Sequence, residues 1–158
     1  MNEQAIQSIV ETVVSKISPK DITLDLAQSV AQKVREKAKK MGVKAVVAIS
    51  NRAACPVLVE SMDDAYIASY DIAVQKAFTV VSLKMSTATL KPLAQPGGSL
   101  YGIQFTNGGK IVIFGGGEPL KYREGQIVGG IGVSGGTEAQ DTALAAYGKE
   151  IFEKGQYL

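Results

Sequence analysis

Apolar residues recur at alternating steps of three and one along the first segment of the chain, MNEQAIQSIVETVVSKI. This period places them on one narrow stripe of a helix, with polar residues elsewhere. The stripe consists of Ile6, Ile9, Val10, Val13, Val14 and Ile17. Ser18-Pro19-Lys20 ends the helix, since proline disfavours helical backbone in the residue before it. We therefore predict an amphipathic helix over residues 1–18 and a separate domain over residues 19–158.

A second helix is predicted from Thr23 to Met41, with one apolar face and a basic opposite face that we interpret as solvated surface. Asp21 or Thr23 can cap its start, and Gly42 is a typical residue after a helix end. The apolar face consists of Leu24, Ala27, Ala31, Val34, Ala38 and Met41. The next two segments, VKAVVAIS and PVLVES, are rich in β-branched residues and are joined by a short connection, which predicts a hairpin.

A third helix is predicted over residues 64–83, with Asp63 or Asp64 as its cap. It has two apolar faces, so we expect it to be buried on two sides. The first face consists of Ile67, Tyr70, Val74, Ala77 or Phe78, and Val81, and the second of Ala65, Ala68 and Ile72.

The second half of the chain predicts three further strands and a closing helix. Asn107-Gly108-Gly109 lies between the strand-like runs LYGIQFT and KIVIF, which is a strong hairpin signal. Residues 115–125 are predicted to be irregular, QIVGGIGV predicts a strand, and Glu138 to Lys154 a helix. Because consecutive strands are joined by short turns, the predicted fold class is α+β, with an antiparallel sheet of about five strands flanked by helices.

A chain of 158 residues has room for one domain with one core. Its apolar runs are too short to span a bilayer, and 17 basic against 15 acidic residues leave a charge too small to favour nucleic acid. We therefore expect neither a membrane nor a nucleic-acid partner. The first residues carry no secretory signal and Cys55 is the single cysteine, so a cytoplasmic location is expected.

Histidine is absent from the chain. Its absence excludes a Ser-His-Asp triad, a Cys-His pair, a histidine zinc site and a histidine ligand to haem iron within one chain.

The segment IVGGIGVSGGTEAQD contains the short signatures of two enzyme classes. Gly132, Ser134 and Gly136 match the G-x-S-x-G of serine hydrolases, but the usual base is missing and nothing selects a lysine in its place. Gly130, Gly132 and Gly135 match the G-x-G-x-x-G of dinucleotide-binding proteins, but only 22 residues follow Gly136, which leaves no second parallel strand. We interpret both matches as coincidence.

The end of the same segment has the pattern of a helix start. Thr137 and Gln140 have the spacing of a capping box. A helix start also presents free N–H groups to which a carboxylate or phosphate could bind.

Five segments, in chain order, resemble the GlcG/HbpS haem-binding family, which includes the C-terminal domain of the PduO corrinoid adenosyltransferase. They are ITLDLA, MDDAYIASYDIAVQKAFTVV, QPGGSLYGI, GGKIVIFGGGEPL and GGIGVSGGTEAQD. The resemblance extends from about Ile22 to Tyr147. It implies a profilin-like or PAS-like fold, assembly into homo-oligomers, and binding of haem or a related tetrapyrrole by some members. The chain departs from the family pattern in having Ser61 where members typically carry arginine, and in lacking histidine.

The cofactor-binding residues that we predict are a lysine in an apolar helix and segments whose backbone N–H groups could approach a ligand closely. They are Lys76, Gly97, Gly98, Gly115, Gly116, Gly117, Gly135, Gly136 and Thr137. Tight turns alone would also explain the glycines. No catalytic residue is predicted and the metal ligand is left open, with Cys55, the methionines Met41, Met62 and Met85, the tyrosines and the lysines as candidates.

From these features we expect a non-enzymatic binding or accessory protein for haem or corrinoid chemistry. The alternatives are a small enzyme that assists corrinoid reduction or adenosylation, and a purely structural oligomer. The helix of residues 1–18 resembles the encapsulation peptides of bacterial microcompartments, which implies a shell or cargo partner and a location in the microcompartment lumen. Alternatively, this helix packs on its own domain or forms an oligomer contact.

Overall fold

The computed structural model describes residues 2–17, 21–122 and 125–156. Its α-helices and short 3-10 helices are α1 (Glu3–Ile17), α2 (Leu24–Lys40), α3 (Ile67–Leu83), α4 (Thr87–Leu93), η1 (Ile103–Phe105), η2 (Asn107–Gly109) and α5 (Glu138–Glu153). Its strands are β1 (Val46–Asn51), β2 (Pro56–Ser61), β3 (Gly117–Lys121) and β4 (Ile127–Ser134). These strands form one antiparallel sheet in the order β2-β1-β4-β3. The predicted α+β class is confirmed, with four strands in the described residues instead of about five.

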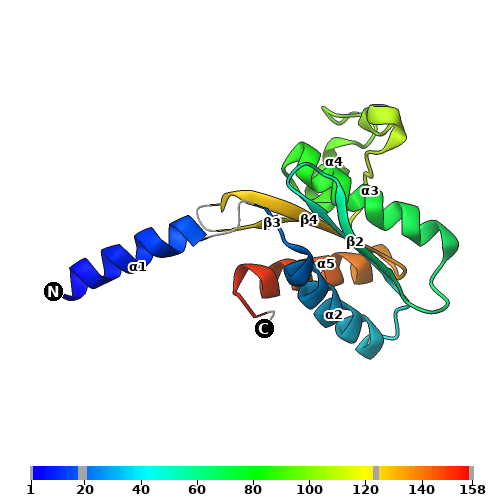
Figure 1. Ribbon diagram of the computed structural model, residues 1–158. Coiled ribbons are helices and arrows are strands. Elements are labelled where there is room, and N and C mark those ends of the chain that lie inside the picture. The colour runs from blue at the N-terminus through cyan, green and yellow to red at the C-terminus, as the bar shows by residue number, and fades with distance from the viewer. Residues whose placement is uncertain (1, 18–20, 123–124, 157–158) are drawn as a thin grey trace.

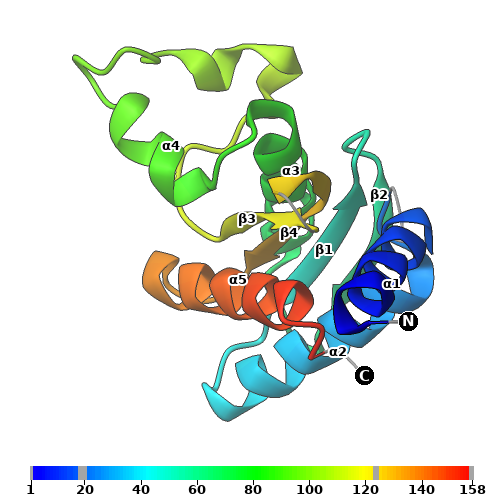
Figure 2. The same ribbon diagram turned by 90° about the vertical axis from the view of Figure 1, so that its left-hand side faces the viewer.

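The sheet separates two layers of helices (Figures 1 and 2). Helix α3 covers one face, while α2 and α5 pack together on the other. Successive side chains of a strand point to opposite faces, so β1 contributes to both layers. Val47 and Ile49 join the larger core beneath α2 and α5, and Val46 and Ala48 contact Ala73 of α3 in a smaller one.

Two glycines of β4 allow α3 to lie directly on the sheet. A Cβ added at Gly132 would come within 2.0 Å of the carbonyl oxygen of Ala73, and one at Gly130 within 2.8 Å of that of Ala77. Both distances are shorter than a Cβ atom tolerates, so a side chain at either position would push α3 away from the sheet. The glycines of the G-x-G-x-x-G match therefore serve the packing of a helix on a sheet.

The buried face of α3 differs from the prediction. Ile67 and Tyr70, which were expected to be buried, are 97% and 55% exposed. Ala77 and Val81 of the first predicted face are buried as expected. The other buried residues of α3 are Ser69, Ala73, Lys76, Thr79 and Val80, whereas Ala68 of the second predicted face is exposed. A helix that approaches a glycine strand this closely favours small residues over large apolar ones, which hydrophobic periodicity does not detect.

The start of α3 also differs from the prediction. Asp64 has a left-handed backbone with φ of 62°, and the helix begins only at Ile67. Tyr66 occupies the N-cap position without a side-chain hydrogen bond, so the predicted cap by Asp63 or Asp64 is wrong. The carboxylate of Asp64 instead accepts a hydrogen bond from Lys44 at 2.9 Å.

The hairpin predicted around Asn107 is wrong. Residues 99–110 form turns and the 3-10 helices η1 and η2, residues 111–113 have no regular secondary structure, and Phe105 is 82% exposed. The apolar run that follows packs against α3, where the N–H of Val112 donates to the Thr79 hydroxyl. The third strand, β3, lies in residues 117–121, which were predicted to be irregular. It contains Pro119, which is tolerated because β3 is an edge strand.

Several local predictions are confirmed. Strands β1 and β2 form the predicted hairpin. The Thr23 hydroxyl accepts from the N–H of Leu26 and caps α2, while Asp21 instead accepts from the N–H of Arg52. Gly42 follows α2 with φ of 70°, as expected after a helix end.

Helix α1 extends away from the rest of the molecule (Figure 1). Four residues of its predicted apolar stripe, Ile6, Ile9, Val10 and Val13, are between 46% and 51% exposed. The side chains of Val14 and Ile17, and the predicted linker Ser18-Pro19-Lys20, lie outside the described residues. No described helix has the length and apolar character needed to cross a membrane.

Candidate functional site

Lys76 lies in the middle of α3, and its side chain is inaccessible to solvent. Its ammonium group donates to the carbonyl oxygen of Val133 at 2.7 Å and to a carboxylate oxygen of Asp141 at 3.2 Å. It also lies 5.1 Å from the centre of the Phe114 ring. Burial lowers the pKa of Lys76, and the charge of Asp141 and its hydrogen bond only partly oppose this shift.

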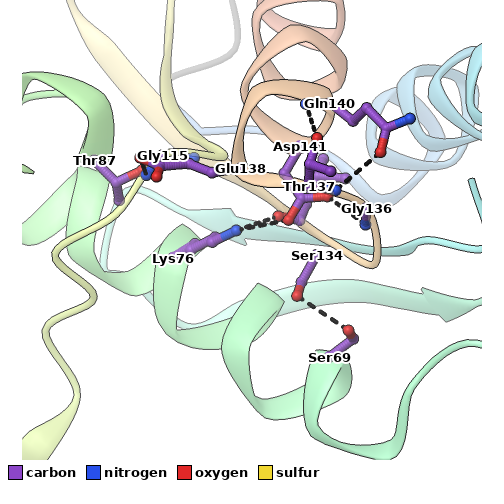
Figure 3. Close-up of polar contacts among 12 residues, drawn as sticks. Ser69, Lys76, Thr87, Gly115, Ser134, Gly136, Thr137, Glu138, Gln140 and Asp141 are labelled. Atoms are coloured by element: carbon purple, nitrogen blue, oxygen red, sulfur yellow. Dashed lines mark hydrogen bonds and ion pairs between the residues drawn. The ribbon is translucent and has the colours of Figure 1, made fainter.

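Asp141 connects this lysine to the turn before α5. Its second carboxylate oxygen accepts a hydrogen bond from the N–H of Gly136 at 2.8 Å. Asp141 lies in the first turn of α5, where a negative charge interacts favourably with the helix dipole. The pair of Lys76 and Asp141 therefore links α3, β4 and the start of α5 (Figure 3).

Residues 115–117 cross directly over the lysine. Gly116 has φ of 114°, and a Cβ on it would lie 2.5 Å from the Lys76 nitrogen. The N–H of Gly115 donates to the Glu138 carboxylate at 3.0 Å, and the N–H of Gly117 to the Thr87 hydroxyl at 2.9 Å. The N–H groups of Gly115 and Gly117 therefore already donate hydrogen bonds to side chains of the protein.

Glu138 connects this segment to α4. Its carboxylate accepts a hydrogen bond from Lys91 at 2.6 Å, and both side chains are partly exposed. The hydrogen bond from Lys91 and then that from the N–H of Gly115 lower the pKa of Glu138. Next to it, Thr137 and Gln140 form the predicted capping box, with hydrogen bonds of 3.2 Å and 2.9 Å.

The structure thus gathers most of the predicted cofactor-binding residues around the buried pair: Lys76, the glycines of residues 115–117 and 135–136, and Thr137. Gly97 and Gly98 lie elsewhere, in the turn after α4. A Cβ on Gly98 would lie 2.2 Å from the Leu93 carbonyl oxygen, which explains this glycine by the turn alone. A role of these residues in ligand binding stays a prediction.

Ser134 does not have the surroundings of a hydrolase nucleophile. It is 5% exposed, and its hydroxyl hydrogen-bonds to the hydroxyl of Ser69 at 3.1 Å. A partner of this kind is not a general base. The match of Gly132, Ser134 and Gly136 to G-x-S-x-G thus reflects a buried contact between β4 and α3.

The candidates for a metal ligand are dispersed. The described residues include no group of three or more cysteine, aspartate and glutamate side chains placed to hold a metal ion. Cys55 is exposed in the β1–β2 turn, and the Met62 sulfur accepts a hydrogen bond from the N–H of Ala45 at 3.3 Å.

Tyr122 lies in different surroundings from these candidates. Its ring packs edge-on against Phe152, with the ring centres 6.5 Å apart. Both residues line a surface hollow of about 420 Å³ between the end of β3 and the end of α5, together with Lys121 and Lys154. Glu153 also lines the hollow, and Phe152 is only 3% exposed. The hollow therefore combines a tyrosine side chain with two positive charges and one negative charge.

Sequence reasoning found Lys76 but missed its partners. Asp141, Glu138, Thr87 and Phe114 were not singled out, because they contact the lysine or the glycines only through the fold. One signal was available for Asp141, since an aspartate in the first turn of a predicted helix can accept hydrogen bonds from the preceding turn.

Comparison with known proteins gives one family match over most of the chain. The family model of haem degrading protein HbpS-like matches residues 22–150. Corrinoid adenosyltransferase PduO of Salmonella typhimurium is 39% identical over 107 residues, which are 68% of this chain and 32% of that protein. The chain therefore spans about a third of the length of PduO.

Two solved structures share the fold. The Klebsiella pneumoniae protein ORFY is 43% identical, with a TM-score of 0.80, and the similarity covers 83% of this chain and 90% of that one. The crystal structure of a PduOC–haem complex is 32% identical, with a TM-score of 0.78, and the similarity covers 82% of this chain and 94% of that one.

Proposed function

Because this chain belongs to the HbpS-like family, we propose that it is a non-enzymatic binding or accessory protein for a tetrapyrrole, either haem or a corrinoid. The similarity to a PduOC–haem complex supports haem as a ligand, and the similarity to a corrinoid adenosyltransferase supports a corrinoid.

The observation that carries the proposal for haem is the hollow beside Tyr122. A phenolate can serve as an axial ligand to haem iron, although histidine is more common. Phe152 is only 3% exposed and holds the Tyr122 ring through its edge-on contact. Lys121 and Lys154 offer positive charge to the carboxylates of the macrocycle. Lys154 pairs with Glu150 in an exposed ion pair, which is weak enough to exchange.

The residues around Lys76 fit a ligand less directly. The N–H groups of Gly115, Gly117 and Gly136 already donate to side chains, and Lys76 is buried and paired. Direct binding there would require Glu138, Thr87 or Asp141 to release an N–H group. We therefore place the proposed haem contact at Tyr122.

Titration of the purified protein with haemin, and separately with a cobalamin, tests this proposal by visible absorption. We expect saturable 1:1 binding of haemin without a bis-histidine spectrum. Tyr122→Phe should change the spectrum and weaken binding, whereas the control Tyr101→Phe, at an exposed tyrosine outside the hollow, should not. No saturation on the order of tens of micromolar for either ligand would contradict tetrapyrrole binding. An unchanged Tyr122→Phe spectrum would contradict only the location.

A small enzyme that assists corrinoid reduction or adenosylation is the second candidate. It is favoured by the similarity to PduO, although this chain corresponds to only 32% of that protein. Conversion of a cobalamin by the purified protein, with a reductant and ATP supplied, would favour this candidate over a binding protein.

We also propose that the protein forms a homo-oligomer. This proposal is supported by the large apolar side chains that stay exposed on α3 and on the segment after α4, since soluble monomers rarely leave such patches open. A purely structural oligomer stays the third candidate, and it would gain support if no ligand binds.

We propose further that α1 is an encapsulation peptide and that the protein is located in a microcompartment lumen within the cytoplasm. The exposed stripe of Ile6, Ile9, Val10 and Val13, on a helix that extends from the molecule, supports this proposal. An amphipathic helix of this kind can bind an apolar groove of a shell or cargo protein. An oligomer contact through the same stripe is the alternative.

A further inference from the structure

Asn107 lies in an exposed turn between α4 and β3, and a glycine follows it directly. Residues 105–110 are all exposed. The backbone of Asn107, Gly108 and Gly109 is left-handed, with φ of 52°, 65° and 78°. Asparagine and glycine adopt this conformation at little cost, which explains why the two residues adjoin here.

The pair of Asn107 and Gly108 is arranged for a reaction within the chain. The backbone nitrogen after an asparagine can attack the side-chain carbonyl carbon and close a five-membered ring, and an intramolecular attack of this kind is favoured by proximity. Gly108 has no Cβ that would hinder the approach of its nitrogen. Among the described residues, the N–H of Gly108 donates to no acceptor, so no hydrogen bond holds this nitrogen in place.

Few contacts restrain the turn. The side-chain amide of Asn107 donates to the Thr106 hydroxyl at 3.1 Å, and the N–H of Gly109 donates to the Thr106 carbonyl oxygen at 2.9 Å. The N–H of Lys110 donates to the Asn107 carbonyl oxygen at 3.4 Å. All of these groups belong to exposed residues, so water can replace each contact at small cost. Asn107 can therefore rotate toward the nitrogen of Gly108 without disturbing the core.

The two other asparagines of the chain lie in different surroundings. The side-chain oxygen of Asn51 accepts hydrogen bonds from two backbone N–H groups, at 2.9 Å and 3.0 Å. The N–H of the following Arg52 donates to the Asp21 carboxylate at 2.8 Å, which holds the nitrogen that would attack. Asn2 precedes Glu3, and its side-chain oxygen accepts a backbone N–H at 2.9 Å. Both residues are therefore internal controls.

We propose that Asn107 is a site of spontaneous covalent modification. The nitrogen of Gly108 forms a bond to the side-chain carbonyl carbon of Asn107. The proton that it loses passes to the side-chain nitrogen, which leaves as ammonia. Water then opens the cyclic imide at either of its two carbonyl carbons, which gives aspartate or isoaspartate at this position.

The modification adds a negative charge to a segment that carries little charge. Lys110 is the single charged residue within residues 92–117. The segment includes the exposed ring of Phe105, which lies close to Asn107 in sequence. The modified chain therefore has no net charge in this segment, and the surface around Phe105 becomes more acidic.

Peptide mapping by mass spectrometry of the full chain, incubated at mildly alkaline pH, tests the proposal. We expect Asn107 to convert with first-order kinetics and faster as pH rises, while Asn2 and Asn51 stay unchanged. Labelling by an isoaspartyl methyltransferase identifies the isoaspartate product. Asn107→Gln should remove this labelling, because glutamine would have to close a larger ring.

Gly108→Ala should slow the conversion severalfold, because its Cβ hinders the attacking nitrogen. The matched control is Gly42→Ala, which replaces another left-handed glycine with no atom within 4 Å of its Cβ and should leave the rate unchanged. An Asn107 that stays intact, or that converts no faster than Asn51, would overturn the proposal. Conversion only after urea has unfolded the chain would do the same, as would equal rates in the wild type and Gly108→Ala.

Discussion

The ammonium nitrogen of Lys76 and a carboxylate oxygen of Asp141 lie 3.2 Å apart between α3 and the first turn of α5, and both side chains are buried. The two residues are 65 positions apart in the sequence. An ion pair in such surroundings is costly to desolvate, but removing only one partner leaves the other charge buried without compensation.

Lys76→Met should therefore destabilise the fold by about 3–5 kcal/mol in urea unfolding. The double variant Lys76→Met/Asp141→Asn should be less destabilised than Lys76→Met alone, because asparagine is uncharged and can still accept from the N–H of Gly136. The control Lys91→Met, in the partly exposed pair with Glu138, should cost about 1 kcal/mol or less. Equal effects of Lys76→Met and Lys91→Met would show that the buried pair has no special role.

The lowered pKa of Lys76 predicts how stability depends on pH. Between its pKa in the folded state and its ordinary value near 10.5, the unfolded chain binds the proton more tightly than the folded chain does. The contribution of Lys76 to stability must then rise with pH between these two pKa values. The difference in unfolding free energy between the wild type and Lys76→Met should widen as pH rises toward 10.5. A difference that narrows would mean that Asp141 raises the pKa overall.

Gly132→Ala should disrupt the contact between α3 and β4, because its Cβ would lie 2.0 Å from the Ala73 carbonyl oxygen. We expect a loss of about 1–3 kcal/mol or more, since the helix must move away from the sheet. Hydrogen exchange should show the loss of protection in α3 before α5.

The control for this substitution is Gly42→Ala. A Cβ on Gly42 meets no atom within 4 Å, so only its left-handed backbone is strained. It should cost about 1–2 kcal/mol without selective exposure of α3. If Gly132→Ala and Gly42→Ala lose hydrogen-exchange protection in the same residues, the close packing of α3 on Gly132 does not stabilise that helix.

Deletion of residues 1–18 should leave the domain folded, because the described part of α1 extends away from it. The same residues fused to a fluorescent protein should recruit it to a microcompartment in a host that forms one. Glutamate substitutions at Ile9 and Val13 should abolish recruitment, and substitutions at Gln4 and Gln7, on the polar positions, should not. Unfolding of the shortened chain would assign α1 to the domain core, and a diffuse fusion would argue for an oligomer contact.

Short-range chemistry let the sequence determine several elements. The helical spacing of apolar residues predicted the buried face of α2, except that Leu24 is 50% exposed. The hydroxyl of Thr23, the left-handed backbone of Gly42, and the capping box of Thr137 and Gln140 likewise act within a few residues. The β1–β2 hairpin is of the same kind, because its two strands are joined by a short turn. Such signals identify an α+β domain without reference to the rest of the chain.

Only the tertiary structure decided which helix face is buried and where the third strand lies. Hydrophobic periodicity selected Ile67 and Tyr70 for the interior, whereas the glycines of β4 admit the backbone of α3 along Ala73 and Ala77. The apolar run after Asn107 packs on α3 instead of pairing, and the strand forms at the edge of the sheet around Pro119.

The surroundings of Lys76 were likewise beyond the sequence. The sequence alone shows that a lysine lies within an apolar helix. Whether its side chain contacts a ligand, solvent or a carboxylate depends on which distant segment the fold places beside it. Asp141 occupies that position because α5 begins directly after β4, the strand against which α3 packs. Short-range sequence signals predicted α3 and α5 separately. Only the packing of both helices against the sheet brought Lys76 and Asp141 into contact.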